Sequence, residues 1–212
     1  SLQKAIDFAM TSFFTTGGVR GHSEKMMAKF FPRTHNMGIK REIYENIGGF
    51  TGLRHGQDIE YSNRIRKSDA RIKFLIDAVV YHRRRSSLKQ FFKQVFNWGV
   101  ARVNLGKIDS NMLEPIHFLP SVAILILFSI IICAIYYQFS LLKLILFFLI
   151  PLILLAIIGA KDKKDLEVFL FLILVIPAQI FGYGIGFVLN YLNRNIMKRE
   201  EWTGFTKNYY KK

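Results

Sequence analysis

Three long runs of apolar residues occupy the second half of the chain. No Asp, Glu, Lys or Arg occurs at 116–142, 144–160 or 168–193. A helix needs about 20 apolar residues to cross the hydrocarbon core of a bilayer, and the core helices of soluble proteins seldom run past about 14 residues without a charge. The pattern therefore predicts an α-helical membrane region of two to three transmembrane helices over residues 117–193. The expected spans lie at about 117–139, 141–160 and 168–190.

The first half carries shorter patterns of both helical and strand type. The apolar spacing indicates helices, and Gly48-Gly49 ends one of them as a glycine C-cap does. Short β-branched and alternating stretches indicate strands. Helices are expected at 2–13, 41–47 and 58–67, and strands at 30–39, 72–76 and 78–81. This mixture predicts an α/β fold for residues 1–107, followed by the membrane helices.

Residues 87–105 form an amphipathic, basic pattern just before the first apolar run. Leu88, Phe91 and Val95 share one helical face, whereas Lys89 and Lys93 lie elsewhere. Such a helix can lie in the headgroup plane of a membrane. It can equally pack its apolar face on the rest of the protein, and the two arrangements are compatible.

The charge balance indicates a negatively charged partner. The chain has a net charge of +15. Residues 1–116 hold 20 Lys and Arg against 10 Asp and Glu, and residues 117–212 hold 10 against 5. Next to membrane spans, this charge favours anionic lipid headgroups or a phosphate-bearing substrate. Nucleic acid is not expected, because no nucleic-acid-binding motif accompanies the charge.

Cysteine usage and the first residues add two constraints. Cys133 is the only cysteine, so a disulfide within the chain and a cysteine-based metal site are excluded. The chain begins at Ser1 within a helical pattern and shows no signal sequence. We therefore expect a fragment whose upstream part is missing.

The basic residues also predict how the chain is oriented. Lys and Arg in short loops mark the cytoplasmic side, so the basic first half and the loop 161–165 are placed there, in a multi-pass protein of the cell (inner) membrane. A third span would leave the basic tail, residues 194–212, outside. Pro177 and the glycines that follow it could instead break the third run into re-entrant or interfacial pieces. Its length alone favours a span.

Residues 36–82 contain the polar residues that are candidates for chemistry. Each has an ordinary structural explanation when taken alone. Asp58 at the start of a helix is usually a cap. His82 at the end of a strand is usually structural, and Arg83-Arg84-Arg85 is usually a solvated or lipid-facing patch.

Together, however, these residues resemble the C-terminal half of the catalytic domain of family 2 glycosyltransferases. The resemblance follows the order of Asn36, Gly48-Gly49-Phe50, Gln57-Asp58, Arg64 and Val80-Tyr81-His82. It covers roughly residues 1–107, and trailing membrane spans also suit the family. It implies the C-terminal half of a GT-A-type α/β domain and an inverting sugar transfer from a nucleotide-sugar donor.

The resemblance assigns Asp58 as the catalytic base. Inverting transfer needs a group that takes the proton of the acceptor hydroxyl, and a carboxylate within hydrogen-bond reach can do so. Gln57 stands where the family usually has Glu, which keeps hydrogen bonding but removes a charge. With Arg64, it is expected to contribute to acceptor or donor binding.

The resemblance also implies a divalent cation, Mg or Mn, with His82 as one ligand. Such an ion neutralises charge that builds on the diphosphate leaving group. Arg83 and Arg84, with Arg85 beside them, would then meet the diphosphate or lipid phosphates.

A second family motif is only partly present. Gln94 and Trp98 match Gln-x-x-Arg-Trp of processive members, but Asn97 stands where Arg would be. Trp98 is therefore either an acceptor-stacking platform or, more in keeping with the missing Arg, an interface or core aromatic residue.

The chain contains no Asp-x-Asp metal motif, which the family carries in its upstream nucleotide-binding half. This fragment alone is expected to be inactive. The complete enzyme would transfer sugar to a lipid-linked or saccharide acceptor in cell-surface polysaccharide or glycolipid synthesis. The rival interpretation is a non-catalytic, basic membrane-anchored protein that binds anionic lipids.

Overall fold

The computed structural model describes residues 1–16, 34–73, 75, 77–78, 80–138 and 140–206, and every regular element in these residues is a helix. The α-helices are α1 (Leu2–Thr11), α2 (Phe13–Thr16), α3 (Arg41–Ile47), α4 (Gln57–Lys67), α5 (Leu88–Ile108), α6 (Leu119–Tyr136), α7 (Leu141–Lys163) and α8 (Glu167–Tyr191). Short 3-10 helices are η2 (Thr34–Asn36), η3 (Ser110–Met112) and η4 (Pro115–Phe118), and a π-helical turn, η5 (Leu192–Ile196), follows α8.

The predicted α/β fold is wrong, because the described residues contain no strand. The segment expected to form strands at 72–81 is irregular wherever it is described, and Tyr81 is 99% exposed. At 34–39 the chain forms η2 and then coil instead of a strand. A strand is stable only when it pairs with others, and its alternating side chains need a face to cover. Residues 30–33, 74, 76 and 79 lie outside the described residues.

The short helices lie where the sequence places them. α1, α3 and α4 fall within one or two residues of the expected ranges at 2–13, 41–47 and 58–67. Gly48 ends α3 with a φ of 76°, a left-handed backbone that glycine adopts without strain. Gly56 precedes α4 with a φ of 84°. These two glycines therefore position the loop between α3 and α4.

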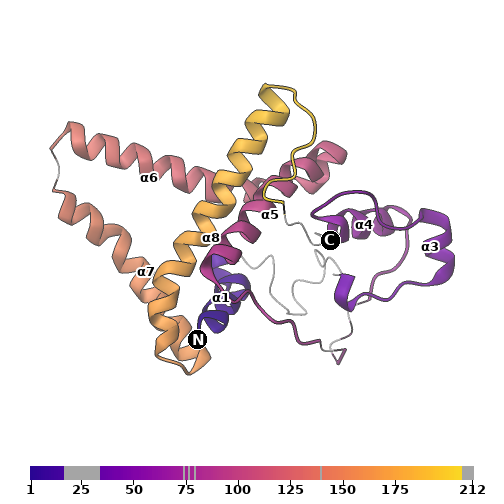
Figure 1. The fold of residues 1–212 in the computed structure, drawn as a ribbon, viewed down its shortest axis with the longest axis horizontal. Coiled ribbons are helices and arrows are strands. Elements are labelled where there is room, and N and C mark those ends of the chain that lie inside the picture. The colour runs from indigo at the N-terminus through magenta and orange to yellow at the C-terminus, as the bar shows by residue number, and fades with distance from the viewer. Residues whose placement is uncertain (17–33, 74, 76, 79, 139, 207–212) are drawn as a thin grey trace, which may run out of the picture.

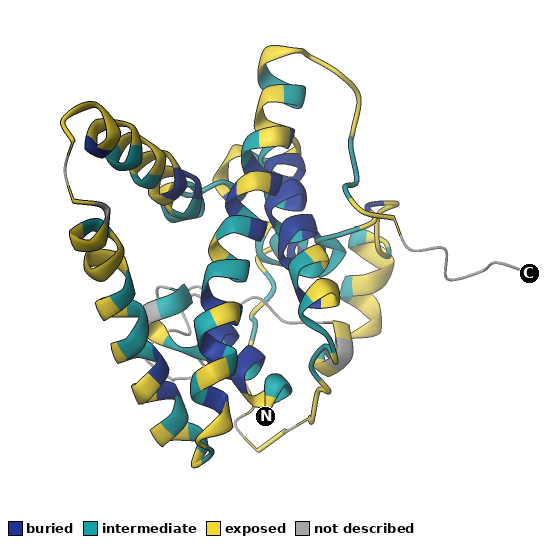
Figure 2. Ribbon diagram, turned by 60° about the vertical axis from the view of Figure 1, so that its left-hand side comes forward, coloured by how far each residue is buried: buried dark blue, intermediate teal, exposed yellow. Residues whose placement is uncertain are grey.

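Three helices are long and apolar enough to cross a membrane: Pro115–Tyr136, Leu142–Lys163 and Glu167–Ile196. Together α6, α7 and α8 form a triangle, with α6 and α7 as two arms that meet far from α8 (Figure 1). The arms are largely exposed along their length (Figure 2). The third run is not broken at Pro177 or at its glycines, because α8 is one continuous helix.

Helix α8 is the centre of the packing. α1, α5, α6 and α7 all pack against it. The main core combines fully buried residues of four helices, among them Ile6, Val95, Ala156 and Leu172. The amphipathic helix expected at 87–105 thus packs its apolar face on the third apolar run of the same chain.

Helices α5 and α8 approach so closely that only glycine fits between them. We call Gly99, Gly182 and Gly186 the glycine seam. A Cβ atom at Gly99 would clash with the carbonyl oxygen of Tyr183, and one at Gly182 would lie 2.6 Å from Cγ2 of Val95. A Cβ atom at Gly186 would clash with the carbonyl oxygen of Phe96. Small residues at such positions let two helices pack backbone to backbone.

Three asparagines extend this contact to the C-terminal tail, and we call them the asparagine ladder. Asn190 is fully buried and donates to the carbonyl oxygen of Val100 and to Oδ1 of Asn104, each at 2.8 Å. Asn104 donates to the carbonyl oxygen of Trp202 at 2.9 Å. Asn97 binds Phe205 twice, donating to its carbonyl oxygen at 2.9 Å and accepting from its N–H at 2.8 Å. Residues 202–205 are therefore fastened to α5.

The glycine seam leads to a first prediction. Gly186→Ala forces a methyl group against the backbone of Phe96, so α5 and α8 must separate. We expect a loss of about 1–3 kcal/mol in the free energy of unfolding, as for other overpacked contacts. Denaturant titration of the detergent-solubilised protein measures it. Gly52→Ala is the matched control, since a Cβ atom there meets nothing within 4 Å; equal stability of the two variants would contradict the seam.

Candidate functional site

Asp58, the predicted base, lies in the first turn of α4. It is partly buried, its Oδ1 accepts the N–H of Ile59 at 3.0 Å, and Ser62 donates to its carbonyl oxygen at 2.7 Å. Ile59 and Leu53 form a small apolar cluster with Leu105 and Met112. That cluster fastens α4, the helix that carries Asp58, to the C-terminal end of α5.

Arg64 joins the glycine loop to the helix that carries Asp58. Its Nη1 donates to the carbonyl oxygen of Ile47 and its Nη2 to that of Gly49, each at 2.6 Å. Its Nε donates to Oε1 of Glu60, also at 2.6 Å. Planar guanidinium donors suit several fixed acceptors at once. Arg64 therefore fastens the Gly-Gly loop to α4, the helix that also carries Asp58. We call Arg64 and its partners Ile47, Gly49 and Glu60 the Arg64 clamp.

Glu60 is the partner in this clamp that the sequence analysis missed. It is 4% exposed and accepts from Arg64 and, at 3.2 Å, from the hydroxyl of Thr51. A buried carboxylate needs such partners. The i,i+4 spacing of Glu60 and Arg64 on a helix was the available signal.

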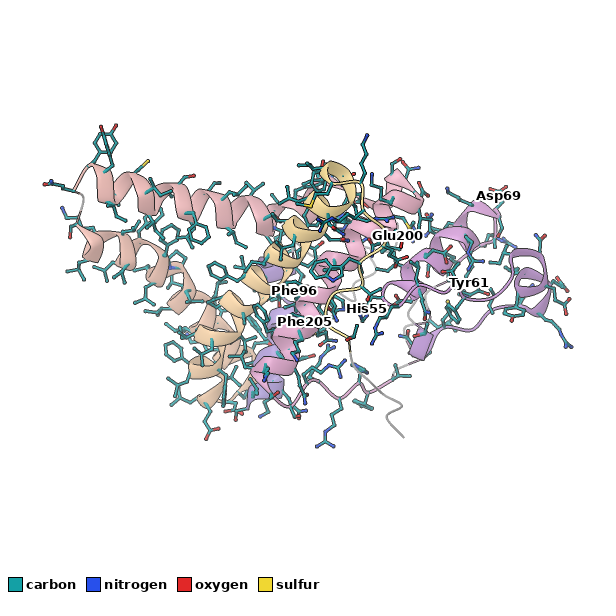
Figure 3. The ribbon with its side chains drawn as sticks, turned by 45° about the horizontal axis from the view of Figure 1, so that its top comes forward. His55, Tyr61, Asp69, Phe96, Glu200 and Phe205 are labelled. Carbon is teal, nitrogen blue, oxygen red and sulfur yellow. The ribbon has the colours of Figure 1, made fainter. Side chains whose placement is uncertain are left out.

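Two aromatic rings pack beside the Arg64 clamp. The rings of Phe50 and Tyr61 lie 4.6 Å apart, and the Arg64 guanidinium lies 5.0 Å from the centre of the Tyr61 ring. Tyr61 is 1% exposed, and burial raises the pKa of its hydroxyl above the ordinary value. Figure 3 shows Tyr61 on the α3–α4 side of the molecule, away from the membrane helices.

Two further polar residues lie within three positions of Asp58 in the sequence. Gln57 donates to the carbonyl oxygen of Thr51 at 3.1 Å, so its amide supports the loop. His55 is half-buried, and its Nε2 has no hydrogen-bond partner among the described residues. Burial and then the charge of Arg54 lower the pKa of His55, which keeps the ring neutral at pH 7. His55 was not a candidate in the sequence analysis because no motif marks it.

The predicted phosphate-binding arginines lie at the other end of α5. Arg84 binds Oδ1 of Asp7 at 2.7 Å, and Lys163 binds Oδ2 of Asp7 at 2.9 Å. Burial opposes the charge of Asp7, but hydrogen bonds from Lys163 and Arg84 outweigh it and lower its pKa. Asp7 of α1 thus joins the segment before α5 to the end of α7.

A basic surface pocket of about 400 Å³ lies next to this ion pair. Arg85 donates to Oε1 of Gln94 at 3.4 Å, and Arg83 is exposed. The pocket adjoins the N-terminus of α5, where backbone N–H groups favour anions. Its lining residues are Gln3, Arg83, Arg84, Arg85, Ser86 and Gln90.

The structure does not bring all predicted site residues together. The Arg64 clamp meets α5 at Leu105, whereas the arginines precede Leu88, and this stretch of helix spans about 26 Å at ~1.5 Å per residue. Gln94 and Trp98 lie between these ends. Trp98 packs against the main core. Asn97, which replaces the family's Arg, fastens the tail instead.

The described residues do not fit a complete Mg or Mn site. Within them, no group of three or more His, Cys, Asp or Glu side chains converges. His82 is exposed in the irregular segment before α5. Its role as a metal ligand stays a prediction from the resemblance.

Comparison with known proteins adds no relative: no family model, curated protein or solved structure matches this chain.

The Arg64 clamp leads to a second prediction. Arg64→Lys keeps the charge but cannot bind Ile47, Gly49 and Glu60 together. We expect amide hydrogen exchange in residues 47–51 to accelerate at least tenfold, with α5 unchanged. Arg71→Lys, an exposed arginine past the end of α4, is the control. Unchanged exchange in Arg64→Lys would show that the loop does not depend on the clamp.

Proposed function

We propose that this chain is the membrane-anchored part of an inverting glycosyltransferase in which Asp58 is the base. The observation that supports this most is the Arg64 clamp. It fastens the Gly48-Gly49 loop to the helix that carries Asp58 and Arg64, which are among the residues on which the resemblance to family 2 glycosyltransferases rests.

In the proposed reaction, Asp58 takes the proton of the acceptor hydroxyl. The hydroxyl oxygen forms a bond to the anomeric carbon of the donor sugar while the bond from that carbon to the diphosphate breaks. The proton passes to a carboxylate oxygen of Asp58, and the nucleoside diphosphate leaves with the bonding electrons. A divalent cation, when bound, would stabilise the charge of that leaving group.

The residues around Asp58 serve this reaction by holding it in place. Arg64 and Glu60 fix the loop before α4, and Gln57 ties the start of α4 to Thr51. The base is thereby held on a helix whose position α5 determines. The three apolar helices make this a membrane protein, and we propose that its acceptor is lipid-linked or a saccharide delivered at the cytoplasmic face of the cell membrane.

A specific observation favours a second function, the binding of anionic lipid. The pocket at Arg83–Arg85 offers guanidinium groups, a hydroxyl and two amides beside the helices that meet lipid. Phosphate groups bind such donor sets. This is also the arrangement that the non-catalytic interpretation requires, so the two functions need separate tests.

The catalytic proposal is tested with Asp58→Asn in membranes from cells that produce the complete gene product. We expect incorporation of radiolabelled sugar, from a panel of nucleotide-sugars, into lipid or saccharide to fall at least about a hundredfold, the usual contribution of a general base. Donor binding should be nearly unchanged, because the base acts on the acceptor.

Asp69→Asn is the matched control, since Asp69 is exposed just after α4 and lies outside the clamp (Figure 3). Near-normal transfer by Asp58→Asn would refute the assignment. Transfer that fails equally in Asp69→Asn would show that the loss comes from folding of α4.

The lipid-binding function is tested with Arg83→Gln combined with Arg85→Gln. We expect several-fold less phosphatidylglycerol to co-purify with the detergent-extracted protein, as counted by native mass spectrometry. Arg71→Gln, which changes an arginine that does not line the pocket, should retain wild-type lipid. Equal lipid in all three proteins would rule out the pocket as the lipid site.

A further inference from the structure

The arrangement of the three apolar helices raises the question of which of them cross the bilayer. Helices α6, α7 and α8 lie along the sides of a triangle and not in a parallel bundle (Figure 1). α6 meets α8 at Gly184, where a Cβ atom would lie 2.5 Å from Cδ1 of Ile124. α7 meets α8 near its other end, where Gly159 packs against Leu172. Three sides of a triangle cannot all run along the membrane normal.

The lengths of α6 and α7, and the spacing of their contacts on α8, fit an arrangement in which α6 and α7 cross the bilayer and α8 does not. The points of attachment at Leu172 and Gly184 lie about 18 Å apart along α8, at ~1.5 Å per residue. The arms from Pro120 to Tyr136 and from Leu141 to Gly159 are each about 24–27 Å long by the same rise. Arms of that length on that base tilt by about 20°, the average tilt of transmembrane helices.

The packing of α5 along α8 is incompatible with α8 spanning the bilayer. The two helices run side by side in the same direction, since Val95 meets Gly182 and Val100 meets Asn190. The outer face of α5 carries the exposed residues Lys89 and Lys93. If α8 crossed the bilayer, α5 would lie at the same depth and those lysines would face hydrocarbon, where charges are strongly disfavoured.

The C-terminal tail indicates independently that an even number of membrane crossings follows α5. The asparagine ladder fastens residues 202 and 205 to the middle of α5, which precedes α6. The ring centroids of Phe96 and Phe205 lie 4.8 Å apart. Figure 3 labels both residues. Two segments bound to each other lie on the same side of a membrane, so an even number of crossings separates them.

The outer face of α8 is apolar, in contrast to that of α5. Leu170, Leu174, Ile185 and Leu189 are 67%, 55%, 38% and 46% exposed and follow one helical face. No charged residue occurs between 168 and 193. Lipid acyl chains are the partner that such a face fits, while α5 covers the opposite face.

We propose that the chain crosses the bilayer twice, through α6 and α7, and that α8 lies along the cytoplasmic membrane surface beneath α5. The apolar outer face of α8 dips into the acyl chains, and the tail returns to the side of α5. Lys161, Lys164, Lys198 and Arg199 then all lie on the base of the triangle, as the positive-inside rule requires. Tyr136 and Tyr137 lie at the apex of the triangle, where α6 meets α7. Tyrosines there suit the membrane–water interface on the side opposite α8.

Cysteine labelling tests the sidedness, with Cys133→Ser as the background. Single cysteines replace Gln138 at the apex, Lys164 between α7 and α8, and Lys198 in the tail. With a membrane-impermeant maleimide on intact spheroplasts, position 138 should label, while 164 and 198 should label only after the membrane is opened. Labelling of 198 together with 138 would overturn the proposal.

Depth measurements test how α8 lies. Nitroxide spin labels at Leu170, Leu174, Ile185 and Leu189, in reconstituted protein, report depth from their collision rates with oxygen and a water-soluble nickel chelate. We expect the same shallow depth at all four positions. Labels at Leu125, Phe128 and Ile132 on α6 should differ in depth, because α6 crosses. A depth that passes through a maximum along α8 would overturn the proposal, whatever the catalytic activity of the protein.

Discussion

The close approach of α5 and α8 is the contact on which the rest of the structure depends. Tight packing and hydrogen bonds hold the two helices together, as small residues at a helix–helix contact allow. Gly99 and Gly186 permit both, because they bring two backbones into van der Waals contact. Only at that separation can the buried amide of Asn190 reach the carbonyl oxygen of Val100. Larger residues in the seam would remove the hydrogen bond together with the packing.

Helix α5 positions a different group of residues at each of its two ends. At its N-terminal end the chain bears the ion pair of Arg84 and Asp7 and the basic pocket. At its C-terminal end Leu105 holds the helix with Asp58 through a small apolar cluster. A base and a phosphate-binding patch that belonged to one reaction would need a substrate, or further protein, long enough to join them. A lipid-linked acceptor has such a length.

The sequence was sufficient for features that depend on local chemistry. Helix ends followed from Gly48, whose left-handed backbone any other residue would strain. The membrane helices followed from long runs without charge. Prediction of secondary structure failed where a segment distant in the sequence decides whether a strand can form. The alternation around Tyr81 resembles a strand, but no neighbouring strand is present among the described residues to pair with it.

The role of the glycines in the third apolar run likewise depends on a contact distant in the sequence. Read locally, Gly182 and Gly186 suggested a break, since glycine weakens an isolated helix. Their function depends on α5, almost ninety residues earlier, and the pattern of one helix does not reveal which face its partner covers. The Arg64 clamp was partly visible, because Glu60 and Arg64 share a helix. The binding of the tail by Asn97 was not, because a single polar residue on an amphipathic helix has many possible partners.

The position of α8 near the end of the chain has a consequence for biosynthesis. A ribosome completes α5 long before it produces the glycines of α8 that α5 needs as a partner. During that interval the apolar face of α5 is uncovered, as surfaces in long-range contacts generally are. The nascent protein must hold this face against lipid or a chaperone until α8 emerges. A chain that stops just after α7 would therefore retain both arms and still lack the partner that α5 needs in order to pack.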